Sequence, residues 1–555
     1  MLYHLSRQSI ASQFIEIRLE LQCSVGETVQ LQLPAWRPGR YELANFAQKI
    51  RGFSVSIGQK EVTWQKITKD LWSFGASTSG LYQVNYSFCC NQMDAGGCWS
   101  DDAQLFINFS NLVFEIKGRE NEEILVQIEL PKEYQTATAL PQIGANEWKA
   151  NSHVHLMDSP LLASGSLKHT QFSIDSTVFH LWFNGEVHFD MEGLAGIFKN
   201  FASKQIEDFG EFPAQSYHFI FQLLPYRHYH GVEHSFSTVI TIGPANSLIE
   251  KAYMDDLIGV SSHELYHFWN VCRIRPLQIL PYDLSRETYL ETGFIMEGVT
   301  TYFGDIYLLR SGYFSLEEYL TQLTALIQKE FDSFGWQIQS ILESSFDLWL
   351  DGYKAGIPDK KVSIYNRGAL IACCLDLMLM DVGSSLADVM KMMWEKFGKT
   401  QKGYKLADFE DTLMEASKNG PEILDFLQKV VYGKDDLLPI LAIQLRSIGI
   451  TIIQESNPER LAGEYGIKLQ DNGEVSQVHP ESMAYKQIMI KDKIPSLFLD
   501  GEAPSGIPSG KEVVFQIERW GRSIEIALKP EKRQFYPIFS LKTVGENEKR
   551  RKWSR

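Results

Sequence analysis

Positive charge is scarce in this chain relative to negative charge. Its 555 residues carry 53 lysines and arginines against 69 aspartates and glutamates, which gives a formal net charge of −16. A nucleic-acid-binding protein needs a basic face for the phosphates, so this balance argues against a nucleic-acid partner. The simplest consequence of the charge is solubility.

Long apolar runs are missing as well. No window approaches the roughly 18 uninterrupted apolar residues that suggest a membrane-spanning helix. The opening MLYHLSRQSIASQFIEIRLELQ has no positively charged segment followed by an apolar core, which is the pattern of a secretory signal. We therefore expect a soluble, cytoplasmic protein with no membrane partner.

Cysteines are few, and no two of them have CxxC spacing. The seven positions are Cys23, Cys89, Cys90, Cys98, Cys272, Cys373 and Cys374. This odd set does not resemble a disulfide framework or a cysteine-based zinc site, so we expect free thiols in a reducing compartment.

The hydrophobic pattern changes along a chain that is too long for one core. Short alternating runs separated by Gly, Pro, Asn and Asp predict an antiparallel β-domain over residues 1–165. Residues 166–449 open with strands and continue with long helical periodicity, which predicts a mixed α+β domain. Short strands return in residues 450–540, and the basic tail 541–555 is predicted to be disordered.

The stretch VSSHELYHFWNVCRIRP contains a candidate metal site. His263 and His267 are four residues apart, and Glu264 follows the first of them. On an α-helix this spacing puts both imidazoles on one face, where they can reach one ion. Zinc favours such ligands and, at a catalytic site, keeps one position for water, whose proton Glu264 can accept. The alternative is an ordinary amphipathic helix whose histidines bond to carbonyl groups.

A catalytic zinc requires a third protein ligand, and Glu297 is the candidate. It stands near the start of the predicted helix GFIMEGVTTYFGDIYLLRSG, thirty residues beyond His267. A set of two histidines and one glutamate leaves the ion open and Lewis-acidic. Taken alone, a glutamate in the first turn of a helix would be a solvated residue; beside an HExxH helix the ligand role is favoured.

Three segments resemble the glycyl aminopeptidase family of gluzincin zinc metallopeptidases. They are SSHELYHFWNVCRIRP, FIMEGVTTYFGDIYLLRSG and SIYNRGALIACCLDL, and LPAWRPGRYELANFAQKIRGF upstream resembles the N-terminal β-domain of that family. The resemblance covers most of residues 1–450. It implies a multidomain α+β fold with an N-terminal antiparallel β-domain, a catalytic domain similar to thermolysin and aminopeptidase N, mainly helical in its second half, and a C-terminal PDZ-like β-domain.

The resemblance also implies roles for individual residues. His263, His267 and Glu297 would hold one Zn²⁺ per chain, and Glu264 would be the general base and then protonate the leaving amine. Tyr365, in SIYNRG, matches the tyrosine that stabilises the oxyanion, where zinc and a phenol would share the developing charge. Without the family, Tyr365 would be one of 23 tyrosines with a packing role.

The segment HYHGVEHSFST would line the substrate cleft in this family. Glu233 matches the carboxylate that pairs with the α-ammonium of a peptide and positions its first peptide bond. Gly231 keeps one glycine of the family pattern, whereas His230 replaces another and would narrow the pocket or change the path of the strand. The alternative for Glu233 is a surface glutamate of a histidine-rich loop.

Two residues beyond the third ligand are candidates for orienting a ligand histidine. Thr301 lies one turn and Asp305 two turns beyond Glu297 on the predicted helix.

Residues 464–504 resemble a PDZ-like domain. Such a domain takes the C-terminal end of a peptide as an added strand, with backbone amides holding the carboxylate. The loop glycines of the pattern are partly replaced, for example by Lys486 and Lys491. A module that only packs against the catalytic domain is the alternative.

Taken together, these residues predict a zinc aminopeptidase that removes small first residues, Gly or Ala, from peptides with a free N-terminus. A non-catalytic peptide-binding scaffold that uses the PDZ-like module and a zinc endopeptidase are the two alternatives.

Overall fold

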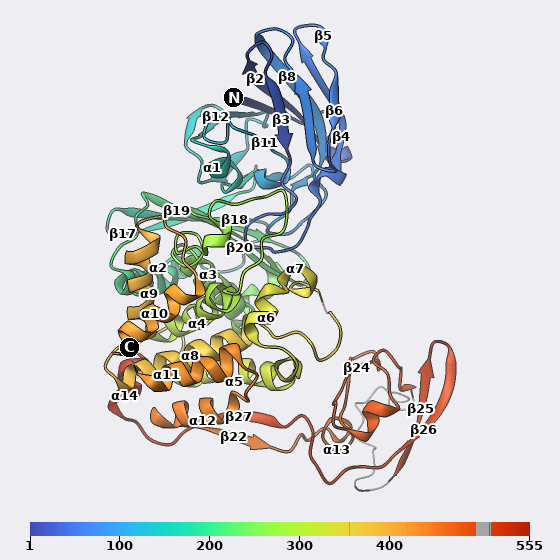
Figure 1. The fold of residues 1–555 in the computed structure, drawn as a ribbon, viewed down its shortest axis with the longest axis vertical. Coiled ribbons are helices and arrows are strands. Elements are labelled where there is room, and N and C mark those ends of the chain that lie inside the picture. Colours follow the sequence, from blue (N-terminus) through green and yellow to red (C-terminus); the bar gives the residue numbers. More distant parts are fainter. Residues whose placement is uncertain (355, 419, 496–509, 511) are drawn as a thin grey trace.

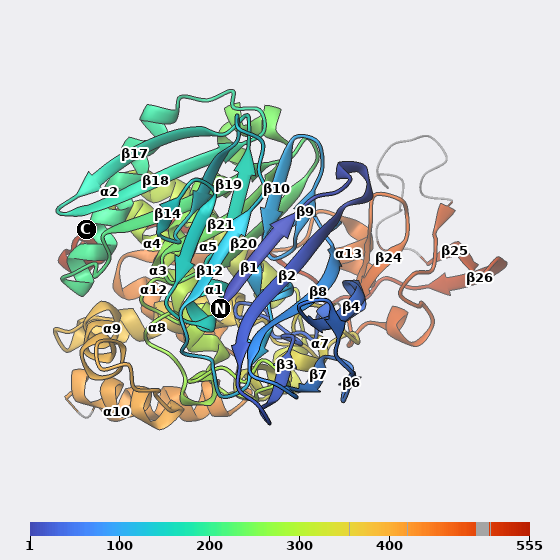
Figure 2. The same cartoon turned by 90° about the horizontal axis from the view of Figure 1, so that it is seen from above.

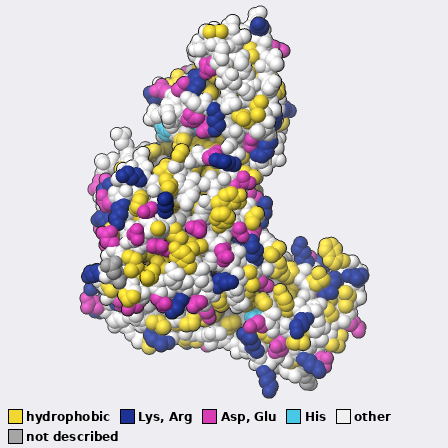
Figure 3. Space-filling view, viewed as in Figure 1, with side chains coloured by type: hydrophobic (Ala, Val, Ile, Leu, Met, Phe, Trp, Pro, Cys, Tyr) yellow, Lys and Arg dark blue, Asp and Glu magenta, His cyan; other side chains and the backbone are white. Residues whose placement is uncertain are grey.

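The computed structural model describes residues 1–354, 356–418, 420–495, 510 and 512–555. Figure 1 shows a β-rich N-terminal domain at one end, a larger central domain, and a smaller C-terminal module set to one side of the central domain. On the face drawn in Figure 3, acidic and basic side chains are interspersed over all three parts.

The N-terminal domain consists of three β-sheets around one apolar core. Along β2 (Phe14–Cys23) alternate residues, Ile15, Ile17, Leu19 and Leu21, are buried, because successive side chains of a strand point to opposite faces. The largest sheet has eight strands in the order β14 (Gln142–Gly144), β15 (Glu147–Ala150), β12 (Ile124–Ile128), β1 (Leu2–Ser6), β2, β8 (Gly80–Cys89), β4 (Ile50–Ile57) and β5 (Lys60–Glu61).

Two four-stranded sheets complete this domain. One has the order β13 (Gln135–Thr138), β16 (Leu161–Ser164), β10 (Gln104–Ile107) and β9 (Trp99–Ser100). The other has the order β11 (Glu115–Ile116), β3 (Thr28–Gln32), β7 (Leu71–Gly75) and β6 (Trp64–Lys66).

The central domain begins with a five-stranded sheet. Its order is β17 (Lys168–Ile174), β18 (Thr177–Asn184), β19 (Ser216–Leu223), β21 (Ser237–Gly243) and β20 (His228–Glu233). Strands β18, β19 and β21 are parallel, and α2 (Met191–Phe209) connects β18 to β19. Strand β20 is antiparallel to β21 and lies at the edge of the sheet. An edge strand offers backbone groups to an extended ligand.

Helices make up the rest of the central domain and lie below the sheet in Figure 1. Those nearest the site are α3 (Lys251–Tyr266), a π-helical turn at Phe294–Val299, α4 (Thr300–Arg310), α5 (Leu316–Phe331) and α8 (Asn366–Asp381). The others are α6 (Ile341–Phe346), α7 (Leu348–Asp351), α9 (Leu386–Met393), α10 (Leu406–Ala416), α11 (Pro421–Phe426) and α12 (Leu438–Ser447). Helix α8 is buried along most of its length, so it forms the centre of this layer.

Within the described chain, no single helix is long and apolar enough to cross a membrane, and one bent pair, Asn366–Asp381 with Leu386–Gly398, passes that test together.

The C-terminal tail is ordered, so the prediction of a disordered segment 541–555 was wrong. Strand β27 (Ile538–Thr543) pairs with β22 (Ile450–Glu455), and α14 (Glu548–Trp553) follows. Figure 1 places this end of the chain against the central domain. Trp553 is fully buried, and its apolar surface outweighs the basic residues around it.

The C-terminal module has a small core of its own. It contains α13 (Arg460–Tyr465) and two strand pairs: β23 (Ile467–Leu469) with β24 (Val475–Val478), and β25 (Val513–Arg519) with β26 (Arg522–Leu528). Figure 2 shows it projecting from the central domain. The segment 497–501, LFLDG, on which the PDZ-like assignment partly depends, lies outside the described residues. That assignment stays a prediction.

Candidate active site

Three predicted metal ligands converge where α3 ends. His263 lies in the last turn of α3, His267 directly follows the helix, and Glu297 lies in the π-helical turn that leads into α4. The two Nε2 atoms are 3.0 Å apart, and Glu297 Oε2 is 3.6 Å from His263 Nε2 and 3.5 Å from His267 Nε2. Tetrahedral zinc with bonds near 2.1 Å would hold its donors about 3.4 Å apart. The spacing of these three atoms therefore fits zinc.

The hydrogen bonds around the ligands also fit a cation. The Nδ1 atom of His267 lies 2.8 Å from the carbonyl oxygen of Asn270; if Nδ1 donates to it, Nε2 keeps a free lone pair for an ion. Burial acts to raise the pKa of Glu297, but the hydrogen bonds and charges of the two histidines lower it to about 2. Glu297 is therefore held as a carboxylate, the form that coordinates a metal.

Glu264 has the surroundings expected of a base that holds a water. It is 5% exposed, and its Oε2 has no hydrogen-bond partner within the described part of the chain. Burial raises its pKa well above the ordinary value. A Cβ at Gly231 would lie 2.2 Å from Glu264 Oε1, so only glycine allows β20 to approach this carboxylate.

Glu233, at the end of β20, joins the same cluster. One oxygen each of Glu233 and Glu264 and a nitrogen of His267 all lie within 4.8 Å of one another. Because side chains alternate along a strand, Glu233 and Gly231 share a face of β20 and His230 lies on the other. Burial raises the pKa of Glu233.

His230, which replaces a glycine of the family pattern, lies near the N-terminal domain. Its Nδ1 is 4.0 Å from Asp94 of the N-terminal domain. Burial lowers the pKa of His230 to about 4, so the ring is neutral near pH 7. The residue borders the cavity from its side of the strand.

These residues line one cavity with a volume of about 750 Å³. Tyr365, the residue before α8, lies in its wall, with its ring 6.5 Å from that of His263 between centroids and at 27° to it. Its ring therefore lies near that of His263 in the wall of the cavity.

Thr301 and Asp305 also line this cavity and do not orient a ligand histidine. Neither forms a hydrogen bond with His263 or His267 in the residues that the structure describes. The positions four and eight residues after Glu297 share its helix face, so their side chains turn toward the cavity. The carbonyl group of Asn270 takes the orienting role for His267.

Sequence reasoning missed two residues of the site. The amide of Asn270 donates to the carbonyl groups of Ile295 and Met296 and thereby ties the segment that follows α3 to the turn that carries Glu297. Gly39, from the N-terminal domain, lies against Glu233. The Trp-Asn pair after HExxH was a signal for the first; nothing local in the sequence pointed to the second.

Comparisons with known protein families match this chain to metallopeptidases. A family profile described as the peptidase M61 N-terminal domain matches residues 2–165, and one described as M61 glycyl aminopeptidase matches residues 256–371; together they cover about half of the chain. A search of curated proteins finds no match.

Among solved structures, an aminopeptidase N family protein from Idiomarina loihiensis is similar over 100% of both chains, with 24% identity and a TM-score of 0.89. This likeness shows the fold. An M1 zinc metallopeptidase from Deinococcus radiodurans, a variant bound to a Tyr-Ser-Ala substrate, is similar over 78% of this chain and 94% of its own, with 14% identity and a TM-score of 0.49.

Proposed function

Since this chain belongs to the M61 glycyl aminopeptidase family and is a metallopeptidase, we propose that it hydrolyses the first peptide bond of peptides with a free N-terminus and a small first residue. The observation that carries the proposal is the position of Glu233 within 4.8 Å of Glu264 and His267. A carboxylate this close to the ion site can hold the substrate's α-ammonium while the adjacent carbonyl group faces the catalytic residues.

The chain's own residues divide the chemistry among them. His263, His267 and Glu297 would hold zinc, which when bound polarises a carbonyl group and makes its water more acidic. Glu264 accepts the proton of the attacking water and passes it to the leaving amine. Tyr365 donates a hydrogen bond to the oxygen that becomes negative, in a cleft where burial strengthens such contacts.

The preference for Gly or Ala rests on the family match and on crowding around Glu233. The family profile that matches residues 256–371 is described as a glycyl aminopeptidase. The carboxylate of Glu233 lies against Gly39, and atoms of Glu264 and His267 lie within 4.8 Å of it. We infer that little space remains beside the ammonium for a large first side chain.

The proposal is tested by metal content and hydrolysis together. We expect one zinc per chain, hydrolysis of glycyl- and alanyl-p-nitroanilide, and loss of activity after chelation. Glu264→Gln should lower kcat by about 10²–10⁴-fold and retain zinc, because Glu264 is a base and not a ligand. A metal-free protein with full activity, or unchanged activity in Glu264→Gln, would contradict the proposal.

A zinc endopeptidase is distinguished by the substrate's N-terminus. If Glu233 binds an ammonium group, N-acetylation of a peptide should remove most of its reactivity, because the acetylated nitrogen carries no charge. Equal rates for acetylated and free peptides would favour the endopeptidase.

A further inference from the structure

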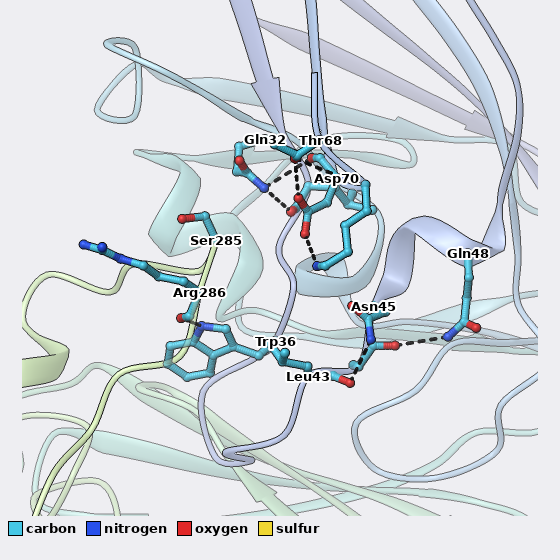
Figure 4. Close-up of polar contacts among 12 residues, drawn as sticks. Gln32, Trp36, Leu43, Asn45, Gln48, Thr68, Asp70, Ser285 and Arg286 are labelled. Carbon is cyan, nitrogen blue, oxygen red and sulfur yellow. Dashed lines mark hydrogen bonds and ion pairs between the residues drawn. The ribbon is translucent and has the colours of Figure 1, made fainter. Parts of the chain in front are cut away.

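A loop of the N-terminal domain enters the central domain beside the site. Residues 33–45, which we call the docking loop, follow β3 and lead to the short helical turn that precedes β4. Trp36 donates its indole N–H to the carbonyl oxygens of Asp283 (3.0 Å) and Arg286 (2.8 Å). Figure 4 shows the indole ring of Trp36 beside Arg286. The N–H of Ala35 donates to Leu284 at 2.7 Å. These bonds hold the loop against the segment that leads to Glu297.

Aromatic packing fixes the same loop. Trp36 is fully buried, with ring centroids 5.2 Å from Trp349 and 6.0 Å from Tyr282, both in edge-to-face geometry. Tyr41, also in the docking loop, lies 5.9 Å from Trp349. Such pairs add to the energy of burial. The loop is therefore part of the packed central domain, although the rest of its own domain stands apart in Figure 1.

The tip of the docking loop lies against Glu233. Gly39 lines the cavity, and a Cβ built on it would lie 2.5 Å from Glu233 Oε2 and 3.0 Å from Oε1. Its φ of +79° is a left-handed conformation that favours glycine. The bare Cα of Gly39 is thus in direct contact with the carboxylate, which no other residue type would allow without displacing it.

A buried cation accompanies this contact. Arg37 is 5% exposed, and its guanidinium occupies the space that a Cβ at Gly96 would take. Burial lowers the pKa of Arg37, whereas the charges of Asp94 and Glu233 raise it. The docking loop therefore brings both a steric wall and a positive charge to the neighbourhood of Glu233.

From these contacts we propose that the N-terminal domain builds one wall of the amine pocket and that Gly39 is a positioning residue, holding the Glu233 carboxylate where it meets the substrate's α-ammonium. The inference rests on the proposed aminopeptidase function. It assigns the N-terminal domain a part in substrate recognition: peptides with a free amine are bound between the two domains.

Gly39→Ala tests the inference with a matched control. With alanyl-p-nitroanilide we expect KM to rise on the order of 10–100-fold with a smaller change in kcat, because the added methyl displaces Glu233 and leaves the zinc ligands in place. Gly26→Ala is the control: Gly26 has a φ of +82° in the same domain, but a Cβ there meets no atom within 4 Å. It should cost similar stability and leave KM unchanged.

A double variant separates positioning from general disturbance. If Gly39 acts through Glu233, the change in KM caused by Gly39→Ala should disappear in a Glu233→Ala background. An effect of the same size in both backgrounds, or equal KM values for Gly39→Ala and Gly26→Ala, would overturn the inference.

Trp36→Phe decides the matter if Gly39→Ala does not fold. It removes the indole N–H that bonds to Asp283 and Arg286 and keeps an aromatic ring. A raised KM for alanyl-p-nitroanilide with unchanged zinc content supports the inference, and an unchanged KM overturns it. A wild-type enzyme without aminoacyl-p-nitroanilide hydrolysis would instead overturn the proposed function, and this inference with it.

Discussion

Two glycines allow the carboxylates of this site to be where they are. Gly231 lies against Glu264, and Gly39 lies against Glu233. A Cβ at either position would overlap a carboxylate oxygen, so glycine is required for close approach rather than for flexibility alone. The two glycines come from different domains, which means that the site depends on how those domains pack.

Replacing Gly231 with alanine should affect the chemical step. The new Cβ would lie 2.2 Å from Glu264 Oε1, so the carboxylate of the proposed base must move. We expect kcat for alanyl-p-nitroanilide to fall about 10–100-fold with zinc content unchanged. Gly75→Ala, at a strand end where a Cβ meets no atom within 4 Å, is the control. An unchanged kcat would show that Glu264 tolerates the displacement.

At this scale the sequence predicted the local features of the site and missed the long-range ones. The approach of His263 to His267 follows from helical periodicity, which the spacing encodes directly. Tyr365 and Glu233 came from the family resemblance. The contact of Gly39 with Glu233 could not be predicted, because it depends on the path of a loop and the docking of two domains.

At the scale of elements, Asn270 joins the two segments that carry the predicted metal ligands. Its side chain is fully buried and donates to the carbonyl oxygens of Ile295 (2.8 Å) and Met296 (3.3 Å). Its own carbonyl oxygen lies 2.8 Å from Nδ1 of His267. One residue therefore sets the position of α3 relative to the Glu297 turn and the orientation of a ligand ring.

Asn270→Ala should weaken zinc binding as well as the fold. The substitution removes the buried amide's hydrogen bonds to Ile295 and Met296, although the Met296 carbonyl keeps the Thr300 hydroxyl as a donor. We expect a cost of about 1–3 kcal/mol, and loosening the predicted ligands should lower zinc affinity about 10–100-fold. Competition with a chelator measures the affinity, and urea unfolding of the zinc-free protein measures the stability. Asn111→Ala removes a comparable buried amide, which donates to Gly96 at 3.0 Å in the N-terminal domain. Equal zinc affinities in the two variants would contradict this role.

Element type was predictable wherever the pattern was regular. The alternation of β2 and the apolar length of α8 identify a half-buried strand and a core helix from sequence alone. The prediction for the tail 541–555 failed because a run of charged residues is typical of disorder. One tryptophan can order such a segment only if it packs into a distant part of the fold, which the local pattern does not reveal. Tyr302, which accepts the hydrogen bond of the Trp553 indole, lies 251 positions earlier.

At the scale of the whole molecule, the C-terminal helix α14 packs against α4, the helix that follows Glu297. The indole N–H of Trp553 donates to the hydroxyl group of Tyr302 on α4 at 2.9 Å, and that hydroxyl donates to Asp376 on α8 at 2.5 Å. Arg310 of α4 donates to the carbonyl oxygen of Trp553 at 3.1 Å. The end of the chain thus stabilises the layer that supports the site.

Removing this contact should destabilise the central domain. Trp553→Ala is expected to cost about 3–5 kcal/mol, since it empties a closed apolar site and leaves Tyr302 without its donor. Thermal unfolding measures the loss. Trp520→Ala, at a side chain that is 87% exposed, should change stability by less than about 0.5 kcal/mol. Similar melting temperatures for both variants would argue for a tail that does not dock.

Stability should decline on mild acidification through buried histidines. Burial lowers the pKa of His153, in the N-terminal domain, to about 4, against about 6.5 in an unfolded chain. Between these values the unfolded state binds the proton and the folded state does not, so stability present above pH 6.5 is lost as pH falls toward 4. In full this is roughly 3 kcal/mol.

The variant His153→Gln measures that contribution. The free energy of unfolding, measured in urea at pH 7, 5.5 and 4.5, should decline less with acid in the variant than in the wild type. The difference in slope should correspond to the uptake of up to one proton on unfolding. Identical pH dependence would mean that His153 is not buried in its neutral form.

The position of a bound peptide's amine tests the central claim most directly. A crystal structure of the zinc-loaded Glu264→Gln variant with an alanyl peptide should place the α-ammonium about 2.7–2.9 Å from a carboxylate oxygen of Glu233. The first carbonyl group should then face the three ligand residues, next to Tyr365. A peptide whose N-terminus extends past Glu233, or an amine bound elsewhere, would contradict an aminopeptidase and indicate an endopeptidase.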